Sequence, residues 1–269
     1  MEKKFSFHST IISYTIKGKG TPVVFLHGFG EDSQIWNKQV SFLQEHCMLV
    51  VPDLPGSGKS SLLVKETAAS DAVSIEDYAD LVYTLLQTEN ISSCIMLGHS
   101  MGGYITLAFA EKYPAMLQAF GLVHSTAFAD SEEKKTMRAK AVTTIAQYGA
   151  TAFLRNTIPN LFGKSFKETY PEKVTQLIAS AAGFTVAALQ QYYVAMMNRP
   201  DRCKVLAGNP LPVLFVMGTE DVAAPMEDVL QQVHLPNISY IHALPGCGHM
   251  GMWEAPEPLN QLLLAFINP

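Results

Sequence analysis

The amino-acid sequence predicts an α/β domain with a mostly parallel, eight-stranded sheet that is covered by helices on both faces. Short apolar runs of strand length alternate along the chain with longer stretches of helical periodicity. A Gly-x-Ser-x-Gly motif at residues 98–102 lies between a strand-like and a helix-like segment. The strand signal is absent from residues 127–206, where helical stretches follow one another. Such alternation is typical of an open sheet whose parallel strands are connected by helices.

The strands are predicted in order from their apolar patterning. Phe5–His8 and Ile11–Ile16 alternate as two hairpin-like strands, and the second ends at the turn signal Lys17–Gly20. Pro22–Leu26 is continuously apolar, which is typical of a strand buried on both faces of a parallel sheet. Further strands are predicted at residues 47–51, 93–97, 119–123, 211–217 and 238–243.

Helices are predicted between these strands. Residues 33–45 have an amphipathic pattern, residues 103–113 form an apolar helix that ends before Pro114, and residues 256–267 form a final helix. Ser74 begins another helix that runs to about Thr88, and Asp77 occupies the capping-box position three residues later. Between Ser60 and this helix we expect a polar loop.

Residues 127–206 predict a helical insertion after the sixth strand. At roughly 80 residues, the insertion is too long to be a plain connection between two strands. We therefore expect two units, a core made of residues 1–126 and 207–269 and a helical insertion of residues 127–206. The helices of the insertion are predicted at residues 131–147, 151–160, 171–182 and 185–197.

Composition and charge exclude several classes of partner. Hydrophobic residues make up 48% of the 269 residues and charged residues only 16%, which indicates a large buried core. A net charge of −5 without a basic stripe argues against nucleic-acid binding. No run of about 18 apolar residues is present, so we expect no membrane span.

The N-terminal residues and the cysteines bear on the compartment. The first residues lack the apolar run of a signal peptide. Cys47, Cys94, Cys203 and Cys247 show neither disulfide nor metal-site spacing, so we expect free thiols in a reducing environment. The sequence therefore predicts a cytoplasmic protein that acts on a small molecule, monomeric by default, with a homodimer as the alternative.

The Gly98-His99-Ser100-Met101-Gly102 stretch is the strongest candidate for chemistry. A serine on a tight strand-to-helix turn is held in a strained backbone conformation with its hydroxyl exposed. Gly98 and Gly102 carry no Cβ atoms that would collide as the chain doubles back. The helix N-terminus beside Ser100 favours developing negative charge.

Polar residues after two later strands supply candidates for a base and an acid. A serine hydroxyl needs a base at neutral pH, and a histidine oriented by a carboxylate can take and return its proton. Ser100, Asp221 and His249 follow one another in the order Ser, Asp, His, and each lies just after a predicted strand. Glu220 and Asp130 are alternative acids.

Backbone donors for an oxyanion are predicted beside the serine. The loop His27-Gly28-Phe29-Gly30 follows a buried strand and can aim the Phe29 N–H at the site. The Met101 N–H, directly after Ser100, is the second candidate donor. We expect His27 and His99 to hold loop backbones by hydrogen bonds.

Taken together, these motifs resemble the α/β-hydrolase superfamily over essentially the whole chain. The resemblance covers the His27-Gly28 loop, the Asp53–Ser60 segment, the Gly98–Gly103 turn, Asp221 and His249. It implies a serine-nucleophile hydrolase without metal or cofactor, and it implies that the insertion is a helical cap. We expect the cap to help make the substrate pocket apolar. Candidate pocket residues are His124, Trp36, Phe128, Tyr192 and Met196.

A nucleotide-binding loop is the competing interpretation of the Asp53–Ser60 segment. Its Gly56-Ser57-Gly58-Lys59-Ser60 end resembles a P-loop, but that pattern requires glycine where Asp53 stands. The P-loop interpretation is therefore rejected.

The predicted function is hydrolysis of a small to medium, rather apolar carboxylic ester through an acyl-enzyme. Alternatives within the superfamily are a carbon–carbon bond hydrolase or a perhydrolase. Carbon–carbon hydrolases usually have a tryptophan after the catalytic histidine, where this chain has Met250, and they use a cap arginine. Arg155, Arg199 and Arg202 are candidates for that arginine, and a buried arginine would imply an anionic substrate. From another class, a non-catalytic small-molecule receptor is the alternative.

Overall fold

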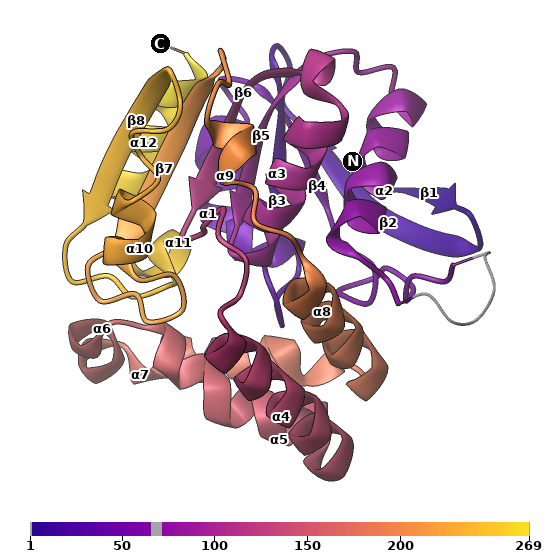
Figure 1. Ribbon diagram of the computed structural model, residues 1–269, viewed down its shortest axis with the longest axis vertical. Coiled ribbons are helices and arrows are strands. Elements are labelled where there is room, and N and C mark those ends of the chain that lie inside the picture. Colours follow the sequence, from indigo (N-terminus) through magenta and orange to yellow (C-terminus); the bar gives the residue numbers. More distant parts are fainter. Residues whose placement is uncertain (1, 66–71, 269) are drawn as a thin grey trace.

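In the computed structural model, which describes residues 2–65 and 72–268, one mixed sheet forms the centre of the protein (Figure 1). The strand order is β1-β2-β4-β3-β5-β6-β7-β8. β1 pairs antiparallel with β2, and β2 pairs antiparallel with β4, whereas all pairs from β4 to β8 are parallel. The strands are β1 (Glu2–Phe7), β2 (Thr10–Lys17), β3 (Pro22–Leu26), β4 (Met48–Pro52), β5 (Cys94–His99), β6 (Leu117–Val123), β7 (Pro212–Gly218) and β8 (Ile238–Leu244).

The eight predicted strands and the mostly parallel sheet are confirmed. Every residue of β5 is buried, and β3 and β7 are buried at all positions after the first. This burial on both faces explains why these strands are continuously apolar in the sequence. The polar loop predicted after Ser60 includes residues 66–71, which lie outside the described residues.

Helices cover both faces of the sheet. α2 and α3 pack against each other on one face, and α1 and α12 pack against each other on the opposite face (Figure 1). Ser74 and Asp77 form the predicted capping box at the start of α2. These helices are α1 (Asn37–Leu43), α2 (Ile75–Thr88), α3 (Met101–Lys112) and α12 (Pro256–Ile267).

The structure corrects the helix predicted over residues 33–45. The Asp32 side chain accepts a hydrogen bond from Gln34 N and begins a 3-10 turn, η1 (Ser33–Trp36), and α1 follows it. Other short helices were not predicted, because four or five residues are too few to show helical periodicity. They are α9 (Cys203–Leu206), α10 (Met226–Leu230) and α11 (Gly251–Glu254), and the six-residue α6 (Lys164–Thr169) was likewise not predicted.

Between β6 and β7 the chain forms a separate helical layer at the carboxyl ends of the parallel strands (Figure 1). The layer contacts the loop after β8, because His249 N donates to Leu161 O at 2.6 Å. The division of the chain at residues 127 and 206 stays a prediction. The layer contains α4 (Glu132–Tyr148), α5 (Ala150–Thr157), η3 (Ile158–Leu161), α6 (Lys164–Thr169), α7 (Pro171–Ser180), η4 (Ala181–Gly183) and α8 (Val186–Asn198).

Two further expectations concern the thiols and the membrane. All four cysteines are free, and Cys47, Cys94 and Cys247 are buried. Among the described residues, no helix is both long and apolar enough to cross a membrane. The cytoplasmic location and the monomeric state stay predictions.

Replacing Ser74 by alanine tests the cap of α2. The variant loses the bond from Asp77 N to Ser74 Oγ, so we expect the free energy of unfolding to fall by about 1 kcal/mol. Ser41→Ala, at an exposed position of α1, is the matched control and should change stability by less than about 0.5 kcal/mol. Chemical denaturation measures both, and equal effects of the two substitutions would contradict the capping argument.

Candidate active site

The turn between β5 and α3 holds Ser100 in an unusual backbone conformation. Its φ of 52° and ψ of −117° lie in a region of backbone conformation that residues other than glycine rarely adopt. Such a conformation costs about 1–3 kcal/mol and persists only when the surroundings impose it. Here Ser100 N donates to Val123 O at 3.1 Å, and Ser125 Oγ donates to Ser100 O at 2.7 Å. The end of β6 and the residues that follow it therefore hold the turn in place.

Gly98 and Gly102 permit this turn because the backbone segments around them are in contact. A Cβ atom on Gly98 would lie 2.2 Å from Gly102 O. A Cβ atom on Gly102 would lie 2.5 Å from Leu26 O in β3. Both contacts involve backbone atoms that cannot rotate away, so each position requires glycine.

His249 and Asp221 meet beside this turn, as their order in the sequence predicts. His249 Nδ1 donates to Asp221 Oδ2 at 2.8 Å, and Oδ1 accepts hydrogen bonds from Ala223 N and Ala224 N, both at 2.9 Å. The carboxylate therefore fixes which imidazole nitrogen carries hydrogen. Nε2 has no hydrogen-bond partner among the described residues, and it is the nitrogen left for proton transfer.

For both Asp221 and His249, burial shifts the pKa in one direction and the charge of the partner shifts it in the other. Burial alone would raise the pKa of Asp221, but the neighbouring histidines outweigh it and hold the pKa far below its usual value. Burial likewise opposes the charged form of His249, but the Asp221 carboxylate raises the pKa of His249 above its ordinary value. Asp221 is therefore ionised at neutral pH.

Two backbone N–H groups beside Ser100 are free to bind an oxyanion. The loop after β3 approaches the turn closely, since a Cβ atom on Gly28 would lie 3.0 Å from Ser100 Cβ. Phe29 N and Met101 N have no hydrogen-bond partner among the described residues. Their position at a helix N-terminus and an adjoining loop suits the stabilisation of negative charge.

Comparison with known proteins identifies the family. Residues 23–262 match the model of the Alpha/beta hydrolase family. The chain belongs to this family. The match covers most of the chain, including every residue of the candidate site.

The relatives of this hydrolase differ in the reactions they catalyse. It is 26% identical to the (E)-2-((N-methylformamido)methylene)succinate hydrolase of Acinetobacter baylyi, over 94% of this chain and 93% of the relative. It is also 26% identical to a 2-hydroxy-6-oxononadienedioate/2-hydroxy-6-oxononatrienedioate hydrolase of Paraburkholderia phymatum, over 93% of this chain and 88% of the relative. A thermophilic esterase from Thermogutta terrifontis, solved with malate bound, has 25% identity and a TM-score of 0.91, over 99% of this chain and 97% of the esterase.

Two further histidines of the hydrolase hold loops, as expected. His27 Nδ1 donates to Gly28 O at 2.8 Å, and His27 Nε2 accepts from Leu54 N at 2.9 Å. His99 faces two oxygen acceptors, Glu31 Oε2 and His249 O, each at 2.9 Å. Both bonds of His99 are made only when both of its ring nitrogens carry hydrogen.

Glu31 and Glu254 are site residues that sequence reasoning missed. Buried Glu31 Oε2 accepts hydrogen bonds from Gly28 N and from His99. One carboxylate therefore connects the loop after β3 (residues 27–30, the oxyanion loop below) to the Ser100 turn. Glu254 accepts hydrogen bonds from the N–H groups of Gly248 and Met250, which flank His249. Glu254 also accepts a hydrogen bond from Gly163 N at 2.8 Å, so both glutamates join segments that are distant in the sequence. Nothing in the local sequence distinguishes either one from a surface glutamate.

The predicted pocket residues are mostly buried. Trp36, Tyr192 and His124 are fully buried, and their place in a pocket stays a prediction. The Trp36 ring packs 4.6 Å from that of Phe25, Tyr192 donates to Pro55 O at 2.7 Å, and His124 faces Asp221. Met196 is 2% exposed and Phe128 is half-buried, and their place in a pocket stays a prediction.

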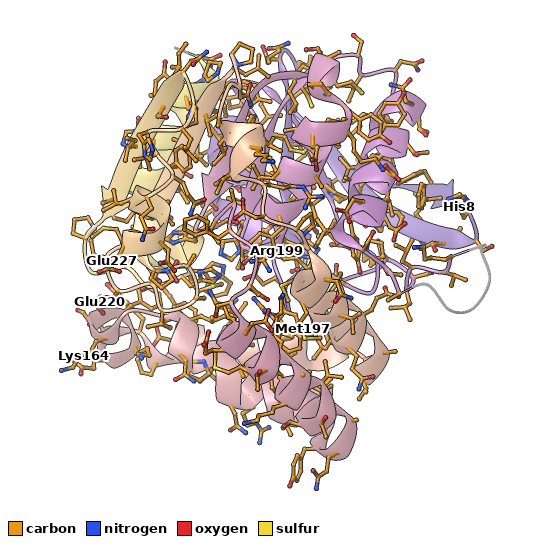
Figure 2. All side chains as sticks on the ribbon, in the orientation of Figure 1. His8, Lys164, Met197, Arg199, Glu220 and Glu227 are labelled. Atoms are coloured by element: carbon orange, nitrogen blue, oxygen red, sulfur yellow. The ribbon has the colours of Figure 1, made fainter. Side chains whose placement is uncertain are left out.

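The alternative acids and the arginines have other partners. Exposed Glu220 accepts a hydrogen bond from Lys164 N at 2.7 Å where the helical layer meets the core (Figure 2). Asp130 pairs with Arg138 and Arg199 instead of with a histidine. Arg202 is paired with Glu76 and Glu111, and Arg155 is exposed. Burial of Arg199 and Arg202 therefore gives no sign of an anionic substrate, because carboxylates of the protein occupy them.

The Gly56–Ser60 segment has a structural explanation. Asp53 Oδ1 accepts from Ser33 N at 3.0 Å and Asp53 Oδ2 accepts from Lys59 N at 2.9 Å. Gly58 has a φ of 50°, and a Cβ atom there would lie 2.3 Å from the Asp53 carboxylate. Asp53, which stands where a P-loop would have its first glycine, thus holds this loop by binding the backbone N–H of Lys59 and joins it to that of Ser33.

The closest described cavity to the oxyanion loop has a volume of about 280 Å³. It lies between Gly30–Lys38 and α7, and Glu31 and Trp253 are in its wall. Ser100 and His249 are not among its lining residues, so it is separate from the candidate catalytic residues.

Substitution of Gly98 by alanine tests the close approach at the Ser100 turn. The added Cβ collides with Gly102 O, so we expect a loss of at least about 1–3 kcal/mol of stability. Gly183→Ala is the control, because a Cβ atom there meets nothing within 4 Å and the variant should be neutral or slightly more stable. Thermal unfolding measures both variants, and an unchanged midpoint for Gly98→Ala would refute the contact.

Proposed function

We propose that this protein is a serine hydrolase that cleaves small to medium carboxylic esters through an acyl-enzyme. Ser100 is the proposed nucleophile, His249 the general base and Asp221 the residue that orients it. The observation that carries the proposal is the 2.8 Å bond from His249 Nδ1 to Asp221 Oδ2, beside a serine with a φ of 52°. The strained backbone at Ser100 costs stability, so its presence beside the His249–Asp221 pair is explained by function.

The proposed reaction proceeds in two halves. Ser100 Oγ attacks the ester carbonyl carbon while His249 Nε2 takes the hydroxyl proton, and the carbonyl oxygen becomes an oxyanion bound by Phe29 N–H and Met101 N–H. The tetrahedral intermediate then expels the alcohol, which receives its proton from His249. Water attacks the acyl-enzyme in the same way and releases the carboxylic acid and free Ser100.

The side chains around the oxyanion loop support an apolar substrate. Phe29 stacks on Tyr193 with ring centroids 4.2 Å apart and meets Phe153 edge-on at 6.5 Å. Tyr193 and Phe153 come from α8 and α5, so the helical layer covers the loop with aromatic rings. Similarity to the Thermogutta terrifontis esterase also supports ester cleavage.

Hydrolysis of p-nitrophenyl esters of increasing acyl length tests this function. Wild type should turn them over with a chain-length optimum, and Ser100→Ala should lose at least about 10³-fold in kcat while it keeps the fold. The rate should fall as pH decreases through the pKa of His249, above the ordinary histidine value of about 6.5, because only neutral His249 accepts a proton.

Four other results would contradict parts of this proposal. Equal activity of wild type and Ser100→Ala would refute the assignment of the nucleophile. Turnover of vinylogous diketones in place of esters would indicate a carbon–carbon hydrolase, and peroxide-dependent turnover a perhydrolase. Tight binding of a small molecule without turnover would indicate a receptor.

A second candidate, a substrate that carries a carboxylate, rests on the charge of one buried cluster. The Asp130 carboxylate is shared by two guanidinium groups, with Arg138 Nε at 2.6 Å and Arg199 Nη1 at 2.9 Å. Two positive charges and one negative charge leave one positive charge in excess. Among the described residues, the Nη groups of Arg138 have no hydrogen-bond acceptor.

Contacts connect this cluster to both sides of Ser100. The Arg199 guanidinium, between the sheet and the helical layer in Figure 2, lies 3.7 Å from the ring centroid of Tyr104, one helical turn after Ser100. The Arg138 guanidinium lies 5.4 Å from the ring centroid of Tyr193, which stacks on Phe29 of the oxyanion loop. The cluster is therefore in contact with α3, which follows Ser100, and with the aromatic rings that cover Phe29. The names of two relatives, a succinate derivative hydrolase and a dienedioate hydrolase, also support an anionic substrate.

Arg138→Gln tests this charge. We expect KM for a p-nitrophenyl monoester of a dicarboxylic acid to rise at least about tenfold, because a charge-assisted bond contributes about 1.5–3 kcal/mol. KM for the neutral ester of equal length should stay the same, since Asp130 keeps its pair with Arg199. Arg155→Gln, at an exposed position of α5, is the matched control and should change neither value. A parallel rise for both esters in Arg138→Gln would show loss of packing, not of charge recognition.

A further inference from the structure

His124 is a buried histidine that the proposed reaction does not use. It directly follows β6, and its backbone N donates to Val216 O of β7 at 2.7 Å. Its Nδ1 lies 3.1 Å from Asp221 Oδ2, the oxygen that also accepts the bond from His249. Because ionised Asp221 can only accept, His124 Nδ1 carries the hydrogen of this bond.

Two unfavourable features coincide at His124. Its φ is 50°, so a residue other than glycine again occupies the left-handed region. With Nδ1 protonated, Nε2 holds a lone pair, and this nitrogen is fully buried without a partner among the described residues. Gly251 closes the space around it, since a Cβ atom on Gly251 would lie 2.4 Å from Nε2. An apolar side chain at this position would avoid the unpartnered nitrogen, so a stability role does not explain a histidine here.

We propose that His124 is a positioning residue that holds the Asp221 carboxylate in line with His249. This inference rests on the proposed serine hydrolase function. Ala223 N and Ala224 N fix Oδ1, and the His124 Nδ1–H fixes Oδ2, the oxygen that also binds His249 Nδ1. The carboxylate then cannot rotate away when His249 becomes an imidazolium during the reaction.

A neutral donor suits this position better than a cation. Burial lowers the pKa of His124 to about 4, so at neutral pH it donates a hydrogen bond and adds no charge. Lysine or arginine here would compete with the imidazolium of His249 for the carboxylate. The other groups that act on His124 are His99 and His249, whose ring centroids lie 6.0 Å and 5.9 Å away.

The matched pair His124→Asn and His124→Leu separates the donor from the shape of the side chain. The two side chains have similar size, but only asparagine can place an N–H near the position of Nδ1, and asparagine also tolerates a positive φ. We expect His124→Leu to lower kcat roughly 10- to 100-fold with little change in KM, because Asp221 loses its orientation. His124→Asn should restore most of this loss.

The pH profile supplies a readout that a packing defect would not move. The charges acting on His249 come from Asp221, Glu31 and Lys134. Without the His124 donor, more of the Asp221 charge acts on His249, so the acid limb of kcat/KM should move to higher pH in His124→Leu and return in His124→Asn. Equal impairment of both variants with an unshifted limb would overturn the proposal, as would a fully active His124→Leu.

Nitrogen-15 NMR of the histidine-labelled wild-type protein measures the tautomer and the titration of His124 directly. This test depends neither on the folding of a variant nor on the ester assay. We expect His124 to remain the Nδ1–H tautomer and not to titrate between pH 5.5 and 8.5. A His124 that titrates in this range or carries hydrogen on Nε2 would refute the positioning bond. If the tautomer is as expected but neither wild type nor variants cleave any ester, the proposed ester hydrolysis fails while the His124–Asp221 bond stands.

Discussion

The strained turn at Ser100 is the constraint on which the arrangement of the site depends. A positive φ at a serine between a strand and a helix requires contacts that impose it. Val123 of β6 and Ser125, two residues after this strand, supply them. The turn also brings Gly102 against Leu26 of β3, so the central strands fix its position from both sides. Packing of the sheet therefore stabilises a local conformation that the isolated segment would not adopt.

Buried histidines then connect this turn to the surrounding loops. His27 joins the oxyanion loop to Leu54, and His99 joins it, through Glu31, to the backbone of His249. His124 and His249 bind the same oxygen of Asp221. Each imidazole offers two polar atoms in a plane, so a few of them can order several loops at once where the strands end.

The sequence predicted the parts of the site that depend on local pattern. The glycines around Ser100, the loop after the third strand and the order of Asp221 and His249 all follow predicted strands, whose carboxyl ends must meet. The capping box at Ser74 was likewise local and is confirmed. Glu31 and Arg138 could not be predicted, because Glu31 binds His99 and Arg138 lies over Tyr193, and both contacts join segments that are distant in the sequence. The partners of Glu254 that flank His249 are close in the sequence, but no local pattern shows that its side chain turns back to their N–H groups.

The proposed function assigns chemistry and specificity to different parts of this fold. Ser100, Asp221 and His249 follow strands of the sheet, whereas the aromatic and cationic side chains around Phe29 come from the helical layer. Burial of Arg199 alone does not show whether its charge is neutralised. Its partner Asp130 also pairs with Arg138, so one carboxylate is shared by two guanidinium groups. The excess charge belongs to Arg138, whose Nη groups lack an acceptor among the described residues. On the proposed function, a change of substrate would require changes in the helical layer, while the residues at the strand ends could stay the same.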